Sequence, residues 1–391
     1  MTSKALLRCL PIALVAMMAA VSMSCAATFT VNTTDDDVDV APGDGICATA
    51  GGACTLRAAI QETNYLPGSD VIVLPAGHYV LTIPGKEDAG AAGDLDIWDN
   101  LRILGAGAAS TVIDANRIDR VLAVDAPQVP EAGPGPVFSP SGVGVPKVYL
   151  SGVSLVNGYT IIDAISGYNG GGIRNCGKLT LENCVVSGNE GTDGGGLNSE
   201  GGSVTLLSTT FSNNVGHFCC GAIRNYYGVK LLMRNSVIKD NRVMSGSGAG
   251  VVDLYPSMFT AYDSTFSGNV ADADGGGILV TGRTTLKRCT ITGNSARGNG
   301  GGLYRVDDDI YHEAGRLRIT DTTISGNTAD SDVSGHGDGG GIYNAVEGCS
   351  MARGTLSGNV DGTGEAPDCA GQLVSKATVI GSVAGCALTA H

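Results

Sequence analysis

Aromatic residues are scarce in this chain. They make up 5% of the 391 residues, and there is a single Trp. A thick globular core filled by rings is therefore not expected. The 43% of hydrophobic residues still allow a real core, and small and β-branched side chains favour thin, repeated layers. Glycine is abundant, at 60 residues, but follows no strict every-third-residue period, which excludes a collagen triple helix.

Positive charge is also in short supply. The chain has 24 Lys and Arg against 38 Asp and Glu, for a formal net charge of −14. Nucleic acid is not an expected partner, because its phosphates require a positive face. Simple electrostatic adhesion to anionic lipid is disfavoured for the same reason. Acidic polysaccharide is disfavoured as well, although bridging divalent cations would still let an acidic protein bind it.

The chain lacks a hydrophobic run long enough to cross a bilayer with confidence. The strongest run, 10–21, follows Lys4 and Arg8 and precedes the small residues Ser24-Cys25-Ala26. This pattern predicts a signal peptide over residues 1–27. A lipoprotein anchored through Cys25 is the alternative, but the Leu expected three residues before such a cysteine is missing. We therefore expect a secreted or cell-surface protein without a transmembrane segment.

No Cys-x-x-Cys pair and no Cys/His set with zinc spacing occurs, so a structural zinc site is not expected. The chain has 12 Cys, and Cys9 and Cys25 precede the mature protein. The remaining cysteines are Cys47, Cys54, Cys176, Cys184, Cys219, Cys220, Cys289, Cys349, Cys369 and Cys386. An even number in an exported chain predicts disulfides.

Two strings recur along most of the chain. The first is a glycine cluster followed by an apolar residue, as in GGGI ending at Ile173 and GGGL ending at Leu197. The second is an SGN-like triplet, whose Asn recurs every 25 to 33 residues and is always preceded, three residues earlier, by an apolar residue. The asparagines are Asn189, Asn214, Asn241, Asn269, Asn294, Asn327 and Asn359, and the apolar residues are Val186, Phe211, Ile238, Phe266, Ile291, Ile324 and Leu356.

Each repeat contains short segments with period-two alternation, such as 178–181 and 203–206, and no helical spacing. This pattern predicts an all-β fold, a single-stranded right-handed parallel β-helix in which one repeat forms one coil. The apolar residues should stack as an inner ladder, and each Asn should turn a corner and bond to its neighbours. A β-propeller needs longer blades, and a leucine-rich repeat needs a Leu frame that is absent. The Pro- and Gly-rich stretch 126–146 reads as a loop that leaves the stack.

The repeat register constrains cysteine pairing. Cys184 and Cys289 occupy the same place, five residues before the corner Asn, but four coils apart. At about 4.8 Å per coil they are too far apart for a disulfide, so each should be a small buried residue. Local pairs, Cys47 with Cys54 and Cys369 with Cys386, are more plausible. The pairing of the others stays open.

One segment near the start has helical spacing. In 55–64, Leu56, Ala59, Ile60 and Thr63 form a narrow apolar stripe, with Thr55 as the N-cap. We expect this helix to cover the open N-terminal end of the solenoid.

The helix and its surroundings carry a family resemblance. The string CTLRAAIQETN (54–64), the acidic run before it and the VLPAGHY stretch after it resemble the signature of the CSLREA-domain family of exported bacterial β-helix proteins. Thr55 and Ala58 depart from the family's usual Ser and Glu. The resemblance implies three parts: the signal peptide 1–27, an N-terminal cap 28–69, and a right-handed β-helix 70–391 that ends in a cysteine-paired unit. It carries no catalytic residues.

Three groups of residues are candidates for chemistry. The string Ser334-Gly-His336-Gly-Asp338 is similar to a polygalacturonase motif but lacks the companion carboxylates, so turn chemistry is the favoured interpretation. The inserts 307–313 and 330–338 hold carboxylates, His312 and His336, and could serve as binding loops. Asp35, Asp37, Asp39 and Asp44 alternate on a glycine-containing loop and could bind calcium.

Two functional hypotheses follow. The first is a monomeric, non-enzymatic exported protein whose loops adhere to a cell-surface component or bind carbohydrate, with calcium as the one cofactor to test. The second is a polysaccharide lyase or glycoside hydrolase on the same scaffold. An enzyme would require two or three carboxylates, or a carboxylate with Arg or Lys, to converge within about 5–10 Å.

Overall fold

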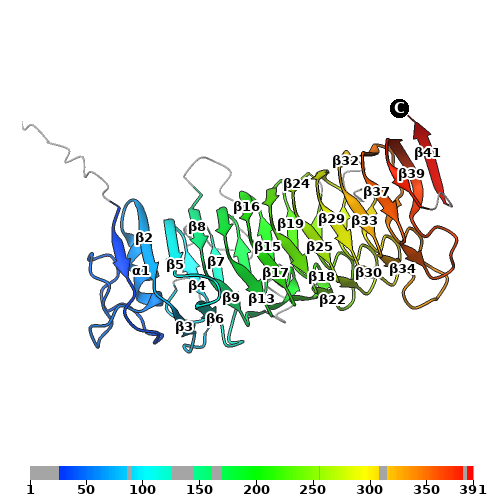
Figure 1. The fold of residues 1–391 in the computed structure, drawn as a ribbon. Coiled ribbons are helices and arrows are strands. Elements are labelled where there is room, and N and C mark those ends of the chain that lie inside the picture. The colour runs from blue at the N-terminus through cyan, green and yellow to red at the C-terminus, as the bar shows by residue number, and fades with distance from the viewer. Residues whose placement is uncertain are drawn as a thin grey trace, which may run out of the picture.

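The computed structural model shows an elongated right-handed parallel β-helix (Figure 1). It describes residues 26–85, 90–125, 145–160, 170–254, 256–307, 315–381 and 385–390. The predicted signal peptide up to residue 25 and most of the loop predicted at 126–146 lie outside this part. The all-β fold class inferred from the repeats is confirmed, whereas the boundaries of the signal peptide and cap stay predictions.

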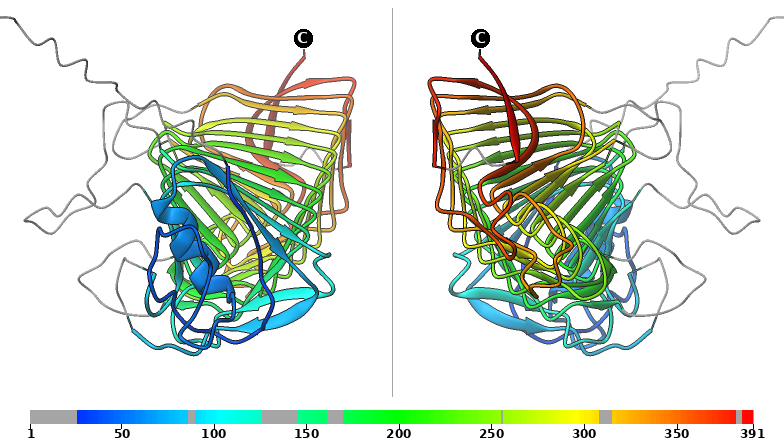
Figure 2. Two further views of the ribbon diagram at one scale, coloured as in Figure 1. Left: turned by 90° about the vertical axis from the view of Figure 1, so that its left-hand side faces the viewer. Right: turned by 90° about the vertical axis from the view of Figure 1, so that its right-hand side faces the viewer.

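Three parallel sheets, which we call A, B and C, run along the solenoid, and Figure 2 shows them end-on as the walls of one tube. Sheet A has 22 strands, because most coils cross it in two successive legs separated by a bend. Its first legs are β4 (Leu95–Ile97), β7 (Leu122–Val124), β11 (Ile173–Asn175), β15 (Leu197–Glu200), β19 (Ile223–Tyr226), β23 (Val251–Asp253), β27 (Ile278–Val280), β31 (Leu303–Arg305) and β35 (Ile342–Asn344). Its second legs are β2 (Ser69–Leu74), β5 (Asn100–Gly105), β8 (Lys147–Ser151), β12 (Lys178–Glu182), β16 (Ser203–Leu207), β20 (Lys230–Arg234), β24 (Met258–Tyr262), β28 (Arg283–Lys287), β32 (Leu317–Thr320) and β36 (Cys349–Ala352). The ends of sheet A are β1 (Thr28–Thr30), β39 (Cys369–Lys376) and β41 (Cys386–Ala390).

Sheets B and C complete each coil, with 11 and 8 strands. Sheet B contains β3 (Gly77–Val80), β6 (Thr111–Asp114), β9 (Ser154–Val156), β13 (Val185–Ser187), β17 (Thr210–Ser212), β21 (Val237–Lys239), β25 (Thr265–Ser267), β29 (Thr290–Thr292), β33 (Thr323–Ser325), β37 (Thr355–Ser357) and β40 (Val379–Ile380). Sheet C contains β10 (Tyr159–Thr160), β14 (Glu190–Asp193), β18 (Val215–Cys219), β22 (Arg242–Val243), β26 (Val270–Ala271), β30 (Ser295–Ala296), β34 (Thr328–Ala329) and β38 (Val360–Asp361).

The apolar and Asn columns predicted from the repeats are both present. The apolar residue of each triplet is fully buried, from Val186 to Leu356. Each Asn side chain donates to the side-chain oxygen of the next Asn, as Asn189 does to Asn214 at 3.0 Å, and that oxygen also accepts the Asn189 backbone N–H. The ladder runs unbroken to Asn359, which donates to Asp368 at 2.8 Å.

A second polar column contains the two stacked cysteines. The hydroxyl of Thr209 accepts the backbone N–H of Cys184, and Ser236 and Ser264 continue the pattern in the next coils. Cys184 and Cys289 are free and buried, which confirms that they do not pair with each other. Cys176 and Cys349 are also free.

The predicted helix is present as α1 (Leu56–Tyr65), and its N-cap Thr55 accepts from Ala58 N–H at 3.0 Å. Leu56, Ala59 and Ile60 are buried against the first coil, and α1 contacts β2 and β4. Figure 2 shows α1 lying across the blue N-terminal end of the tube. The predicted Cys47–Cys54 disulfide is confirmed, with the Cα atoms 5.1 Å apart.

Charged side chains hold the cap to the solenoid. Arg57, which is 1% exposed, binds both carboxylate oxygens of Asp36 and donates to the carbonyls of Gly90, Gly93 and Asp94. Glu62 on the same helix is fully buried and accepts the N–H groups of Gly43 and Gly45. The loop 34–54 is therefore fastened to α1 by charge-assisted hydrogen bonds.

Two other disulfide cysteine sets were left open or predicted only in part. Cys219 and Cys220, adjacent in sequence, form a disulfide with each other. Cys369 is disulfide-bonded. The side chain of Cys386, its predicted partner, lies outside the described part, although the Cys386 backbone pairs with Gly371.

Candidate functional site

The candidate site follows a column of outward-facing residues on the first legs of sheet A. Strand register places one such residue in each coil. We call this column the outer lane: Arg174, Asn198, Arg224, Val252, Leu279, Tyr304, Tyr343 and Ala370. Because coils are about 4.8 Å apart, the lane is a continuous strip along the solenoid axis.

Glycine clusters border the lane for a steric reason. A Cβ at Gly195 would lie 2.4 Å from the carbonyl oxygen of Val215, and one at Gly275 would lie 3.1 Å from Cβ of Leu279. Larger residues would clash with the next coil or with the lane itself. The repeated GGG string therefore permits the corner to fold closely against the lane.

The lane begins with a buried charged cluster centred on Arg224. One guanidinium nitrogen, Nη1, lies 3.7 Å from Asp193 and 3.6 Å from Glu200, and Asn198 donates to Glu200 at 2.9 Å. Burial raises the pKa of both Asp193 and Glu200, and Arg224 only partly offsets that rise. The Asn198 side-chain oxygen is buried without a hydrogen-bond partner in the described part of the chain. Carboxyls with raised pKa values beside an arginine are groups that can transfer protons.

Next to this cluster, Arg174 pairs with Asp125 at 3.0 Å. Burial and the neighbouring Asp125 raise the pKa of the Cys176 thiol to about 12. A thiol this weakly acidic stays protonated at neutral pH, so Cys176 is unsuited to act as a nucleophile.

The middle of the lane is apolar. Val252 and Leu279 are 2% and 8% exposed and pack with Cys220, and Cys219 and Tyr304 lie against the same group. The adjacent-cysteine disulfide therefore belongs to the wall of the lane.

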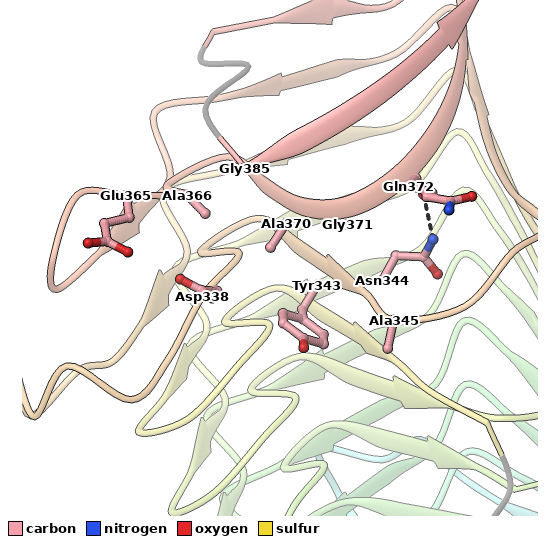
Figure 3. Close-up of a pocket in the computed structure, with 10 residues that line it drawn as sticks. All are labelled: Asp338, Tyr343, Asn344, Ala345, Glu365, Ala366, Ala370, Gly371, Gln372 and Gly385. Carbon is pink, nitrogen blue, oxygen red and sulfur yellow. Dashed lines mark hydrogen bonds between the residues drawn. The ribbon is translucent and has the colours of Figure 1, made fainter.

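The lane ends in an aromatic pair beside an open cleft. The rings of Tyr304 and Tyr343 are 5.3 Å apart and tilted by 31°. The cleft next to Tyr343 has a volume of about 520 Å³. We call it the C-terminal cleft; it is lined by Asp338, Tyr343, Asn344, Ala345, Glu365, Ala366, Ala370, Gly371, Gln372 and Gly385 (Figure 3).

The cleft combines a ring with polar groups. Figure 3 shows the Tyr343 ring below β39, with Asp338 and Glu365 to one side and Gln372 to the other. Asn344 is held in place by donating to the Gln372 carbonyl. Glu365 and Gln372 are exposed, so their side chains are available to a ligand.

The structure separates the residues of the Ser-Gly-His-Gly-Asp string. Asp338 lines the cleft, whereas His336 is exposed on the loop before it. Asp330, fully buried, accepts from Ser334 and Gly335 N–H groups and fixes that loop. This is the turn chemistry expected from the sequence. Most of the other insert, including His312, lies outside the described residues.

The four aspartates proposed as calcium ligands each bond to nearby protein groups. Asp39 accepts the backbone N–H groups of Ala41 and Ala48. Asp37 and Asp44 accept N–H groups of Val38 and Ile46, and Asp35 accepts the Thr33 hydroxyl. In the described part of the chain, no group of three or more Cys, His, Asp or Glu has the arrangement of a metal site. The calcium site stays a prediction.

The sequence signalled only part of this site. The glycine clusters located the corners, but the lane residue two positions after them varies from Arg to Tyr and so showed no pattern. Glu200 and Arg224 looked like ordinary surface residues. A count of the residue that follows each GGGI- or GGGL-like string would have found the column.

Comparison with known proteins supports the architecture. The family model for a right-handed β-helix region matches residues 142–296, and a Chlamydia polymorphic membrane protein repeat matches 321–345. No curated protein matches significantly. Among solved structures, pectate lyase Pel9A is similar at 13% identity and TM-score 0.43, covering 93% of this chain and 79% of that one. The A-module of the Azotobacter vinelandii mannuronan C-5 epimerase AlgE6 is similar at 14% identity and TM-score 0.34, covering 92% and 93%.

Proposed function

We propose that this chain is an exported β-helix protein that binds polysaccharide without cleaving it. The observation that carries the proposal is the Tyr304–Tyr343 pair at the mouth of the C-terminal cleft. Sugar rings have apolar faces and hydroxyl edges. An aromatic ring beside exposed carboxylate and amide groups offers a stacking surface and hydrogen-bond partners at once.

Export and family membership belong to the same proposal. The N-terminal pattern of a signal peptide, the disulfides and the likeness of the cap to the CSLREA signature support them. Within the described residues, no helix is long and apolar enough to span a membrane.

A glycan-array screen followed by calorimetry tests the binding. Tyr343→Ala should weaken the affinity for the best array ligand about tenfold, because one ring stack is worth about 1–3 kcal/mol. The matched control Tyr65→Ala removes an exposed tyrosine from α1 at the opposite end and should leave affinity unchanged. Equal affinities for wild type and Tyr343→Ala would refute the role of the cleft.

An enzyme is the second candidate, and one observation favours it. Asp193 and Glu200 share Arg224 in a buried cluster on the lane, and both have raised pKa values. Release of reducing ends or unsaturated products from a polysaccharide panel, with and without calcium, would show activity. Loss of that activity in Glu200→Gln, with binding retained, would assign the cluster a catalytic role. No product from any polymer leaves the binding function standing alone.

Calcium at Asp35, Asp37, Asp39 and Asp44 also remains a proposal. Carboxylates alternating with glycine turns are its support. A rise in melting temperature on adding calcium, absent in Asp37→Asn/Asp44→Asn, would establish it.

A further inference from the structure

The second legs of sheet A carry an unusual concentration of positive charge on their outer face. We call this surface the basic face. Its cations are Arg102, Lys147, Lys178, Lys230, Arg234, Arg283, Lys287, Arg316, Arg318 and Lys376. Nine are exposed and Lys287 is half-buried. These ten are a large share of the 24 Lys and Arg in the chain, although the protein as a whole is strongly acidic.

Strand register aligns these cations in columns. Lys147 lies beside Lys178, and Ser203, Lys230, Met258 and Arg283 continue the same column in successive coils. A second column, at the other end of each strand, contains Arg234 and Lys287. With coils about 4.8 Å apart, the two columns form parallel rows of charge along the solenoid axis.

The cations of the basic face have no protein counter-charge. None of the ten forms an ion pair with another described residue, whereas Arg117, Arg174, Arg288, Arg297 and Arg353 elsewhere all do. Among the outward-facing described residues of β5, β8, β12, β16, β20, β24, β28, β32 and β36, the one carboxylate is Glu182. That group accepts the Tyr149 hydroxyl at 2.6 Å. Unpaired like charges on one face repel each other, and an external anion would relieve the repulsion.

The surface between the rows suits a sugar polymer. The central column presents the hydroxyl side chains Thr180, Thr205, Thr260 and Thr285, one per coil except where Leu232 intervenes. Tyr149 and Tyr262 flank it, each covered by a guanidinium, Arg102 at 5.1 Å and Arg234 at 4.6 Å from the ring centre. Hydroxyls and guanidinium forks can bind both sugar hydroxyls and carboxylate or sulfate groups.

We propose that the basic face binds a linear anionic polysaccharide, laid along the solenoid axis with its acidic groups on the two rows of cations. A lipid surface fits less well, since interfacial binding uses apolar anchors and Met258 is the one exposed large apolar residue on β8, β12, β16, β20, β24, β28 and β32. Single-stranded nucleic acid stacks its bases on open rings, but both tyrosines here are covered. The ligand and the surface both differ from those of the C-terminal cleft.

The test compares two double variants of the full mature chain. Lys178→Ser/Lys230→Ser removes two charges from the basic face, and serine is compatible there because Ser203 occupies the same column. The control, Lys239→Ser/Arg242→Ser, removes two exposed charges from sheets B and C and gives the same net charge. Binding is measured to heparin and polygalacturonate, with dextran as the neutral polymer, over a range of NaCl concentrations.

Wild type should bind heparin and polygalacturonate at low salt, and dextran at least about tenfold more weakly. The basic-face variant should lose at least about tenfold in affinity and show a weaker salt dependence, because fewer counterions are released. The control should stay within about twofold of wild type. Equal losses in both variants, or no binding by wild type, would overturn the proposal.

Two further arms separate this surface from other interpretations. Tighter binding to single-stranded DNA or to anionic lipid vesicles than to either polysaccharide would overturn the choice of ligand. Tyr343→Ala should keep full affinity for the anionic polymers. If that variant loses affinity for them and the basic-face variant does not, the C-terminal cleft is their site and the basic face is not. Circular dichroism melts confirm that each variant is folded.

Discussion

At the scale of single residues, the bend in sheet A holds a row of buried polar groups inside the tube. Asn175 donates to Ser199, and Asn225 donates to Asp253. Two coils on, Arg305 donates to Asn344 and to the carbonyls of Gly315, Val346 and Glu347. Arg305 has four acceptors, so its burial is compensated by hydrogen bonds, but Asp253 has only neutral partners.

Asp253 should make stability depend on pH. Burial raises its pKa to about 7, against 3.8 for the free side chain, although hydrogen bonds from Asn225 and Thr284 oppose the rise. The folded state therefore binds this proton more tightly than the unfolded state. The contribution of Asp253 to stability is full below pH 4 and is lost as pH rises from about 4 to 7.

Asp253→Asn imitates the protonated acid and should remove this dependence. The variant should be more stable than wild type at pH 8, by about 1.4 kcal/mol for each unit of pKa shift at most, and similar to it at pH 4. Urea melts at the two pH values measure the difference. A variant that is less stable than wild type at both would contradict the assignment.

At the scale of elements, the Asn ladder joins coils that local strand pairing alone would leave less firmly aligned. Asn294 donates to the Phe266 carbonyl and to Asn327, and its oxygen accepts two N–H groups from Asn269. The environment is fully buried, so each lost partner is unsatisfied.

Asn294→Ala should destabilise the protein by about 3 kcal/mol or more, because several buried groups lose their partners together. Thr292→Ala, a half-exposed position on β29 of the same coil, is the control and should change stability by less than about 0.5 kcal/mol. Chemical denaturation followed by circular dichroism gives both values. Similar midpoints for the two variants would mean that the ladder contributes little.

The cap is the second element with a direct test. Leu56→Asp/Ile60→Asp places charges on the buried face of α1 and should cause misfolding or multimerisation, since the first coil would lose its cover. Val40→Asp/Ile46→Asp alters two exposed apolar residues of the cap loops and serves as the control. Light scattering coupled to gel filtration reports the mass. A monomeric, equally stable Leu56→Asp/Ile60→Asp variant would disprove the capping role.

The sequence predicted those parts of the fold that repeat. The Asn, apolar and Ser/Thr/Cys columns recur in every coil, and α1 has its own periodicity, so each could be read from spacing. The outer lane could not, because Arg224, Val252 and Tyr304 share a position but no chemistry. The Cys219–Cys220 disulfide was also missed, because a column argument compares coils and says nothing of neighbours in sequence.

At the scale of the whole molecule, net charge proved a poor guide to the surface. The value of −14 predicts weak attraction for polyanions, but that argument averages over all faces. Strand alternation sends the Lys and Arg of β8, β12, β20 and β28 to one side. The basic face emerges only when the coils are stacked, and so linear sequence could not display it.

Because coils contact their immediate neighbours, the solenoid should accept loss of one complete repeat. Deleting residues 215–241 removes one coil and brings Asn214 into register with Asn269, so both ladders remain continuous. This variant should fold with a similar circular dichroism spectrum. Deleting 215–228 alone shifts the register and should abolish folding. Equal behaviour of the two deletions, measured by thermal melts, would contradict this modular description.

The Asn ladder also gives the molecule an electrical direction. Every side-chain amide donates toward the C-terminal neighbour, so the amide dipoles are aligned with their positive ends facing that way. Aligned dipoles add, as they do in an α-helix, and attract a negative charge at the positive end. The last acceptor in the row is the carboxylate of Asp368. An anion thus terminates the row where its field is positive, and the two ends of an otherwise repetitive tube are electrostatically distinct.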